Sequence, residues 1–92
     1  MLITIDEVKK SLQKYDWIYD NKCIFKEYKF DNYMDGISFV NKVAEIAERK
    51  NHHPDIQIGW CKVKLSISSH DLGGVTTQCV NLAMEIQDLN NY

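Results

Sequence analysis

Residues 56–69 have the sequence IQIGWCKVKLSISS, in which apolar and polar side chains largely alternate. Ile58 and Trp60 share one parity. The other parity carries three apolar residues, Val63, Leu65 and Ile67. Alternation with a period of two is typical of a half-buried β-strand, and a change of parity marks a turn or bulge. The stretch therefore predicts two strands that double back on each other near Cys61.

A long amphipathic helix is predicted upstream of this stretch. Asp31 or Asn32 can cap it, and it should run to about Asn51. Its apolar stripe steps by four and three residues and consists of Tyr33, Ile37, Val40, Ala44 and Ala47, widened by Phe39, Val43 and Ile46. Pro54 biases His53 away from the helical region, so the chain should turn there.

Three further segments complete the expected order of elements. Thr4-Ile5-Asp6-Glu7 is a capping box that begins a helix over about residues 4–14. Two strands joined by a hairpin are predicted between Trp17 and Phe30, and Thr76 can cap a last helix. The apolar stripe of that last helix is Val75, Cys79, Leu82, Ile86 and Leu89.

The resulting order, α-β-β-α-β-β-α, predicts a single domain over residues 1–92. Antiparallel strands with helices gathered on one side form an α+β two-layer sandwich. We therefore expect a four-stranded antiparallel sheet with three helices on one face.

Composition argues against several classes of protein. Eleven Lys and Arg against thirteen Asp and Glu give a formal charge of -2, so the broad basic surface of a nucleic-acid or membrane-surface binder is missing. No apolar run is long enough to span a bilayer. Cys23, Cys61 and Cys79 are widely spaced and odd in number, which argues against a disulfide framework and favours the reducing cytoplasm. Neither nucleic acid nor a membrane is an expected partner.

The three histidines, His52, His53 and His70, lie in the loops that bracket residues 56–69. Imidazole titrates near neutral pH, so converging histidines suit general acid–base chemistry, worth roughly 10²–10⁴ in rate. Glu48 stands four residues before His52 and would share a helical face with it, where a carboxylate can fix the imidazole tautomer. The alternative is that these are solvated loop imidazoles and a solvated helix-end Glu.

A metal site is a rival use of the same residues, because three histidines and a carboxylate can hold zinc. Adjacent His52 and His53 lack the helical spacing of metal ligands, so neither a metal nor a cofactor is expected. Arg49 and Lys50 are interpreted as a solvated helix face.

These residues form a specific pattern. It consists of an acidic residue, three residues, His-His-Pro, an aromatic residue six positions after the proline and a histidine ten positions beyond that. The pattern occurs here at Glu48, His52, His53, Pro54, Trp60 and His70. It resembles that of the pterin-4a-carbinolamine dehydratase family, and the resemblance covers nearly the whole chain.

The resemblance implies a hydro-lyase that dehydrates a 4a-hydroxytetrahydropterin to the quinonoid dihydropterin and so recycles the pterin cofactor of aromatic amino-acid hydroxylation. It implies His52 and His70 as acid–base residues, with Glu48 as an orienting carboxylate. The implied substrate-binding residues are His53, Pro54, Trp60 and Cys79. It also implies a homodimer or homotetramer. We expect the three histidines to converge on one cleft beside Trp60, with Glu48 within reach of His52.

Position 79 departs from the family pattern, which usually has Asp nine residues after the third histidine within a Thr-x-x-Asp stretch. Here that stretch is Thr76-Thr77-Gln78-Cys79. Cys79 is either a small buried hydrophobic residue of the helix stripe or a thiolate stabilised by the helix N-terminus and nearby imidazoles. Two rival functions stay open, and the departure allows the first of them. One is a weakly active or inactive pterin-binding paralogue, and the other is an interaction protein, because animal members of the family also act as dimerisation cofactors.

Overall fold

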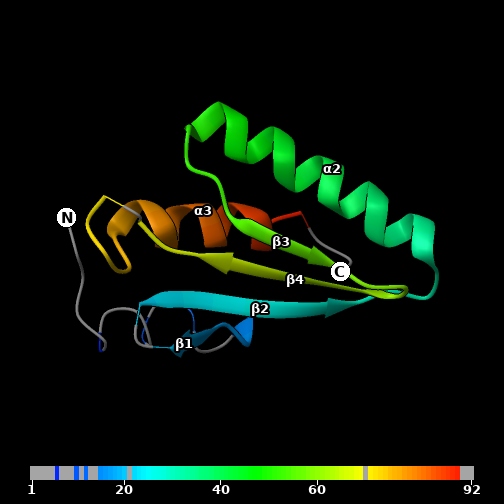
Figure 1. The fold of residues 1–92 in the computed structure, drawn as a ribbon, viewed down its shortest axis with the longest axis horizontal. Coiled ribbons are helices and arrows are strands. Elements are labelled where there is room, and N and C mark those ends of the chain that lie inside the picture. The colour runs from blue at the N-terminus through cyan, green and yellow to red at the C-terminus, as the bar shows by residue number, and fades with distance from the viewer. Residues whose placement is uncertain are drawn as a thin grey trace.

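The structure is a computed structural model that describes residues 6, 10, 12, 15–20, 22–69 and 71–89. Four strands, β1 (Ile18–Asp20), β2 (Cys23–Lys29), β3 (Asp55–Ile58) and β4 (Lys62–Ile67), form one antiparallel sheet in the order β1-β2-β4-β3. Helices α2 (Tyr33–Lys50) and α3 (Thr77–Gln87) lie on one side of this sheet (Figure 1). The α+β class and the four-stranded antiparallel sheet are therefore confirmed. Within the described residues, neither helix combines the length and apolar character that a membrane crossing requires.

The helix predicted over residues 4–14 falls largely outside the described residues. Asp6, Lys10 and Leu12 are described, and all three are helical. Leu12 is 1% exposed and belongs to the hydrophobic core. The existence of a complete third helix stays a prediction.

The hairpin of β3 and β4 confirms the predicted doubling back near Cys61. Ile58 pairs with Val63, and the Gly59 N–H donates to the Lys62 carbonyl at 2.8 Å across the turn. The turn residues themselves absorb the change of parity seen in the sequence. Trp60 is one of them, so it does not lie on a strand as the alternation had indicated.

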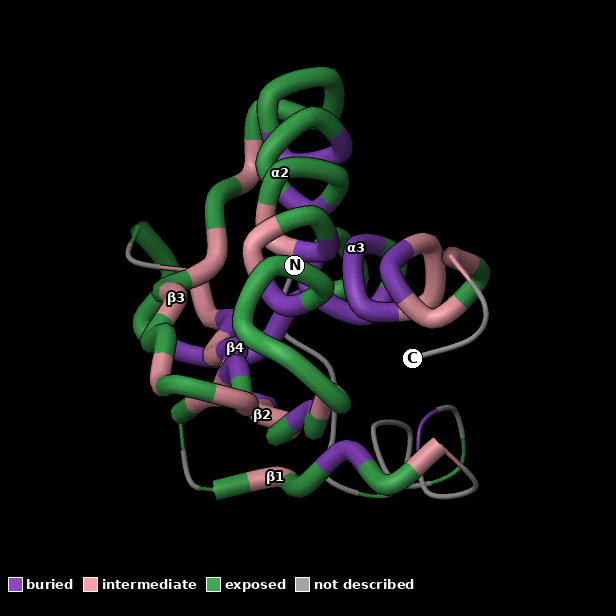
Figure 2. Tube along the Cα trace, turned by 90° about the vertical axis from the view of Figure 1, so that its right-hand side faces the viewer, coloured by how far each residue is buried: buried purple, intermediate pink, exposed green. Residues whose placement is uncertain are grey.

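The hydrophobic core fills the space between the sheet and the two helices, as the buried segments in Figure 2 show. Its fully buried residues from strands are Ile24, Val63, Leu65 and Ile67, and those from helices include Phe39, Val43, Leu82 and Ala83. The Phe39 ring lies 4.6 Å from the ring of Tyr28 and 5.4 Å from that of Phe30, measured between centroids. These aromatic contacts join the first half of α2 to β2.

The face of α2 that packs on this core differs from the predicted stripe. Its buried residues are Gly36, Phe39, Val43, Ile46 and Ala47. Tyr33 and Ala44, which the stripe placed inside, are exposed. Gly36 faces the sheet closely, because a Cβ at this position would be in van der Waals contact with the Phe30 ring at 3.4 Å. A glycine therefore lets the first turn of α2 approach the sheet, and the residues expected to widen the stripe become its centre.

Local capping sets the ends of both helices as predicted. The Asn32 side chain accepts a hydrogen bond from the Asp35 N–H at 2.9 Å, and the Thr76 hydroxyl accepts one from the Cys79 N–H at 3.3 Å. Each satisfies a backbone donor that the helix itself leaves unpaired. At its other end α2 stops at Lys50.

A polar cluster ties the end of α3 to the first two strands. The Gln87 side-chain oxygen accepts from Lys26 Nζ at 3.0 Å, Trp17 Nε1 at 3.3 Å and the Tyr28 hydroxyl at 3.4 Å. Burial raises the pKa of Tyr28 and lowers that of Lys26, because both charged forms lose hydration there. A single amide thus holds three donors at the edge of the core.

Candidate functional site

The His-His-Pro segment follows directly on the C-terminus of α2. Asn51 adopts the left-handed conformation, with φ of 51°. The Asn51 N–H donates to the Glu48 carbonyl at 3.2 Å, and the His52 N–H donates to the Ala47 carbonyl at 3.1 Å. These bonds close the last turn of a helix whose next residue is left-handed. The chain is redirected there, so that His52 is partly buried and His53 is exposed.

His52 packs against the beginning of α3. Its Nε2 lies 3.3 Å from Cys79 Sγ, and the same sulfur lies 3.3 Å from the Thr76 hydroxyl oxygen. Cys79 is 0% exposed. It is therefore in the interior and does not line the cavity described below, and its predicted role in substrate binding stays a prediction. The thiol belongs to the buried stripe of α3, as the interpretation as a small hydrophobic residue expected. It also contacts an imidazole, as the alternative interpretation expected.

Glu48 pairs with His53, whereas the sequence had indicated His52. His53 Nε2 lies 2.7 Å from Glu48 Oε1. The expectation assumed that the helix continues through residue 52. Because α2 ends at Lys50 and Asn51 is left-handed, the helical face is interrupted and the carboxylate meets the next imidazole. The two side chains are 54% and 79% exposed, so the pair orients the His53 ring but contributes little to stability.

A polar cavity of about 550 Å³ opens beside the two histidines. Four segments line it: the end of α2 and the following turn, the first residue of β3, the loop after β4, and the first turn of α3. Their lining residues are Lys50, Asn51, His52, His53, Pro54, Asp55, Ser68, Ser69, Asp71 and Gln78. A second hollow of about 270 Å³ is lined by Lys50, His52, Gln78 and Asn81. His52 therefore borders both spaces.

His70 lies outside the described residues, so the convergence of three histidines stays a prediction. Its neighbours Ser69 and Asp71 line the cavity beside His52 and His53. Ser69 also forms a β-bridge with Gly74, and Gly73 in that loop has a φ of 67° that glycine adopts without strain. The loop that carries His70 thus closes on itself at the edge of the cavity.

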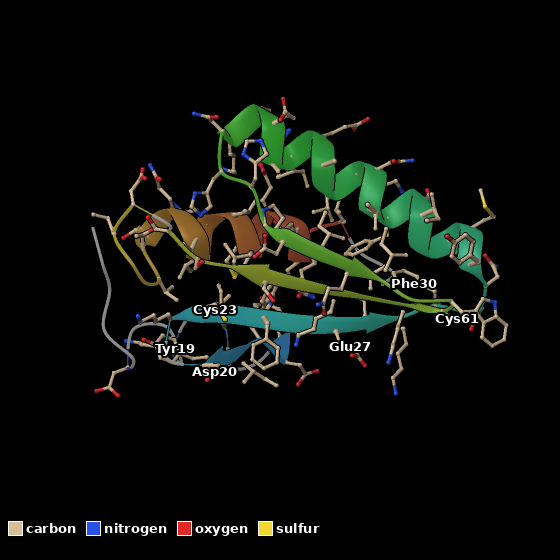
Figure 3. All side chains as sticks on the ribbon, viewed as in Figure 1. Tyr19, Asp20, Cys23, Glu27, Phe30 and Cys61 are labelled. Atoms are coloured by element: carbon tan, nitrogen blue, oxygen red, sulfur yellow. The ribbon has the colours of Figure 1, made fainter. Side chains whose placement is uncertain are left out.

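Trp60 does not lie beside the histidines of its own chain, and this part of the expected cleft is wrong. β3 leads away from Asp55 for roughly 10 Å, at about 3.3 Å per residue, and Trp60 lies beyond its far end. Figure 3 shows the neighbouring Cys61 at the tip of the hairpin, distant from the connection between α2 and β3. Trp60 is 80% exposed and borders a separate hollow with Lys29, Phe30, Cys61 and Lys62.

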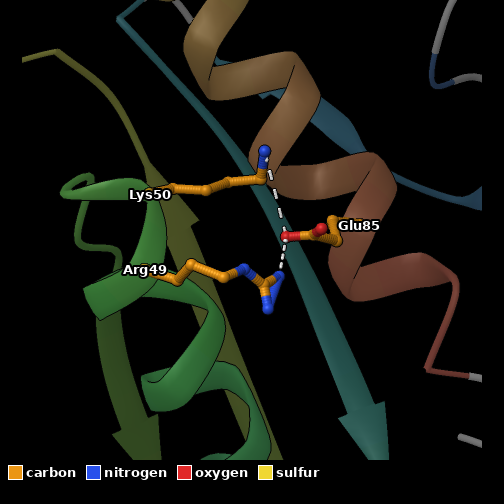
Figure 4. A network of polar contacts seen from close by, with 3 residues as sticks. All are labelled: Arg49, Lys50 and Glu85. Carbon is orange, nitrogen blue, oxygen red and sulfur yellow. Dashed lines mark hydrogen bonds and ion pairs between the residues drawn. The ribbon is translucent and has the colours of Figure 1, made fainter.

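The two basic residues that end α2 bind α3. Arg49 Nη2 lies 2.6 Å from Glu85 Oε2, and Lys50 Nζ lies 3.9 Å from the same oxygen (Figure 4). Both residues are exposed, as the interpretation as a solvated face indicated, and they also form ion pairs with α3. Through these ion pairs α3 holds the end of α2 from which the histidine turn begins, and Lys50 also lines both hollows.

Sequence reasoning missed several residues that line the cavity. Asp55, Ser69 and Asp71 are sequence neighbours of Pro54 or His70, so their place beside the motif was an available signal. Gln78, which also lines the cavity, and Asn81, which lines only the second hollow, lie on α3 and carried no such signal. Among the residues that the structure describes, no group of three or more His, Cys, Asp or Glu side chains is arranged to hold a metal ion.

The chain matches a known protein family over nearly its whole length. The family model described as "Pterin 4 alpha carbinolamine dehydratase" matches residues 1–89. A protein of Prochlorococcus marinus named "Putative pterin-4-alpha-carbinolamine dehydratase" is 47% identical over 75 residues, which cover 82% of this chain and 79% of the relative. A protein of the same name from Sulfolobus acidocaldarius is 34% identical over 90 residues, which cover 97% of this chain and 99% of the relative.

Two solved structures share the fold. One is titled "Crystal structure of transcriptional coactivator/pterin dehydratase from Brucella Melitensis". It superimposes with a TM-score of 0.90 at 22% identity, covering 99% of this chain and 100% of the other. The second is described as a pterin dehydratase-like protein that is a RuBisCO assembly factor in the alpha-carboxysome. Its TM-score is 0.68 at 22% identity, covering 79% of this chain and 87% of the other. One fold thus serves proteins with different described roles, so the site has to carry the functional argument.

Proposed function

Because the chain belongs to the pterin 4 alpha carbinolamine dehydratase family, we propose that it removes water from a 4a-hydroxytetrahydropterin to give the quinonoid dihydropterin. The observation that carries the proposal is the pair of adjacent imidazoles, His52 and His53, on the wall of a polar cavity. The reaction needs a proton delivered to the C4a hydroxyl, which leaves as water. A second proton leaves N5 as the double bond between C4a and N5 forms. An imidazole beside the bound ring suits such a transfer, and its neighbour on the same wall can bind the ring.

The two histidines are held by different partners. His52 contacts the buried Cys79, and His53 contacts the exposed Glu48. We assign His52 to proton transfer and, on the family resemblance, His70 as well. Glu48 then orients His53, which binds the pterin from the same wall as Pro54.

The rest of the cavity wall supports a polar heterocyclic ligand. Asp55 and Asp71 supply carboxylates, the serines after β4 supply hydroxyls, and Gln78 supplies an amide. The edge of a pterin ring alternates hydrogen-bond donors and acceptors. A few polar groups of both kinds can fix the orientation of such a ring.

The decisive experiment is spectroscopic turnover of a 4a-hydroxytetrahydropterin generated in the cuvette, compared with its uncatalysed dehydration. His52→Ala and His53→Ala should each lower kcat/KM, with the His52 variant losing roughly 10²–10⁴-fold as expected for an acid–base residue. Gln57→Ala is the matched control, because Gln57 is exposed on β3 and does not line the cavity. A parent protein that fails to exceed the uncatalysed rate would refute the dehydratase function.

The same preparation separates the rival functions. Pterin binding without turnover, measured by fluorescence titration, identifies a non-catalytic pterin-binding paralogue. If the protein shows neither turnover nor pterin binding, the remaining candidate is the interaction role described for some proteins of this fold. Copurification with a partner protein then becomes the relevant measurement.

We also propose that the chain forms a homodimer or homotetramer. β3 is an edge strand, and its Ile58 is 47% exposed. The first turn of α2 exposes Tyr33 and Met34, at 47% and 67%. An unpaired edge with exposed apolar residues is a template for pairing with a second copy. Sedimentation that shows only the 10.8 kDa monomer at micromolar concentration contradicts the proposal, and Ile58→Lys should weaken an oligomer.

We place this activity in the cytoplasm. Cys23, Cys61 and Cys79 are all free thiols, which a reducing compartment preserves.

A further inference from the structure

Three side-chain and backbone contacts form a continuous path from the α3 backbone to the cavity. The Cys79 N–H donates to the Thr76 hydroxyl oxygen at 3.3 Å, and that oxygen lies 3.3 Å from Cys79 Sγ. The sulfur in turn lies 3.3 Å from His52 Nε2. Thr76 and Cys79 are buried, whereas His52 borders the cavity. The path therefore links a rigid helix terminus to the imidazole that faces the substrate space.

The groups along this path can donate in one consistent direction, from the helix backbone to the imidazole. A backbone N–H can only donate, so the Thr76 oxygen is the acceptor of the first link. Its own hydrogen can then be donated to the sulfur. A sulfur that accepts from this hydroxyl keeps its S–H hydrogen for His52 Nε2. Donors arranged head to tail in this way reinforce one another in a buried environment.

We propose that Cys79 is a positioning residue that holds neutral His52 in the tautomer protonated at Nδ1. A neutral imidazole that accepts at one nitrogen carries its proton on the other. A carboxylate at position 79 has no proton to donate when ionised, so it would instead favour the proton on Nε2. Replacing residue 79 should therefore change how the proton is shared between the two nitrogens of His52. The catalytic consequence rests on the proposed function, but the tautomer itself does not.

Other charged and titratable groups line the same cavity as His52 and stay unchanged when residue 79 is substituted. Lys50 and His53 come from its own segment, Asp55 from β3 and Asp71 from the loop after β4. A difference among variants at position 79 therefore reports the contact between residue 79 and the imidazole.

The test is a long-range proton–nitrogen NMR correlation on the full chain labelled at histidine nitrogens, recorded above the pH at which the rings lose their charge. The parent and Cys79→Ser should show His52 protonated at Nδ1, because both carry a hydrogen that can be donated. Cys79→Asp should show the proton at Nε2. Cys79→Ala should move the population toward Nε2, the tautomer that a free histidine side chain prefers. A parent already protonated at Nε2, or an Ala variant with the tautomer of the parent, would overturn the proposal.

Kinetics provides the second measurement. Cys79→Ala should lower kcat by roughly 3- to 10-fold, the rate equivalent of one neutral hydrogen bond, with little change in KM. Cys79→Ser should restore most of the loss. Ile86→Val is the stability control, because Ile86 is buried in α3 at 1% exposure. It should lower the melting temperature and leave the His52 tautomer unchanged.

The two proposals fail in different ways. Absence of turnover in a parent whose His52 is protonated at Nδ1 refutes the dehydratase function and leaves the role of Cys79 standing. Turnover in a parent whose His52 is protonated at Nε2 refutes the role of Cys79 and leaves the dehydratase function standing.

Discussion

Replacing Gln87 with Leu should destabilise the fold, because one amide oxygen anchors three donors at the end of α3. That oxygen accepts from Lys26 Nζ at 3.0 Å, Trp17 Nε1 at 3.3 Å and the Tyr28 hydroxyl at 3.4 Å. Leu has a similar volume and no acceptor. Trp17 and Tyr28 are 6% and 4% exposed, so water replaces their lost bonds poorly.

The magnitude follows from the three contacts. The Lys26 bond is charge-assisted but partly exposed and is worth about 1 kcal/mol, and the two longer neutral bonds are worth about 0.5–1 kcal/mol each. The free energy of unfolding should therefore fall by about 2–3 kcal/mol, a large share of the 5–15 kcal/mol typical of a small domain. For a chain of this size the melting temperature should fall by roughly 10–20 °C.

Gln87→Glu is the matched control, because it keeps the acceptor and adds an ion pair with Lys26. The ammonium should hold the pKa of the new carboxyl below its ordinary value of about 4.3. A carboxyl whose pKa is lower in the folded state stabilises the fold at pH values above its unfolded-state pKa. This stability is lost as the pH falls through the folded-state pKa. The Glu variant should therefore match or exceed the parent at pH 7 and lose its advantage towards about pH 3.

Urea titration at pH 7 and thermal melts at both pH values measure these effects. The reasoning is refuted if the Leu variant loses less than about 0.5 kcal/mol, or if Glu is as damaging as Leu at pH 7. Gln87 lines neither the polar cavity beside His52 and His53 nor the second hollow. Turnover per folded molecule should therefore be unchanged in both variants.

Substitutions at three further positions test the packing, the capping and the ion pair between the helices. Gly36→Val should cost about 1–3 kcal/mol, since a Cβ alone would stand 3.4 Å from the Phe30 ring; a melt that matches the parent contradicts this packing. Thr76→Val should cost about 1 kcal/mol by removing the cap of α3. Thr76→Ser should cost less, and equal losses in thermal melts count against the cap. Glu85→Gln should change stability by less than about 1 kcal/mol because its pair with Arg49 is exposed, and a larger shift of the urea midpoint shows that this judgement is wrong.

The ends and types of the described elements were predictable because they depend on near neighbours in the chain. Asn32 and Thr76 cap their helices through residues three positions away. The hairpin of β3 and β4 follows from an alternation that changes parity over a few residues. Pro54 and the end of α2 likewise place a turn at His52 and His53 from local backbone preferences alone.

The face that α2 buries was not predictable from its stripe. The helix carries apolar residues over a wide arc, so several rotations bury a similar apolar area. Close approach of Gly36 to Phe30 and Val63 selects one rotation, and this contact exists only once α2 lies on the sheet.

By itself, the sequence determined that two adjacent histidines follow a helix and precede a hairpin, because capping, proline and alternation act over a few residues. Tertiary packing alone decided their partners. The contact of His52 with Cys79 joins residues 27 positions apart, and that of Arg49 with Glu85 joins residues 36 positions apart. Such contacts depend on where α3 lies against α2, which no local pattern specifies. Glu48 was expected to reach His52 but contacts His53, because the single left-handed residue Asn51 redirects both imidazoles.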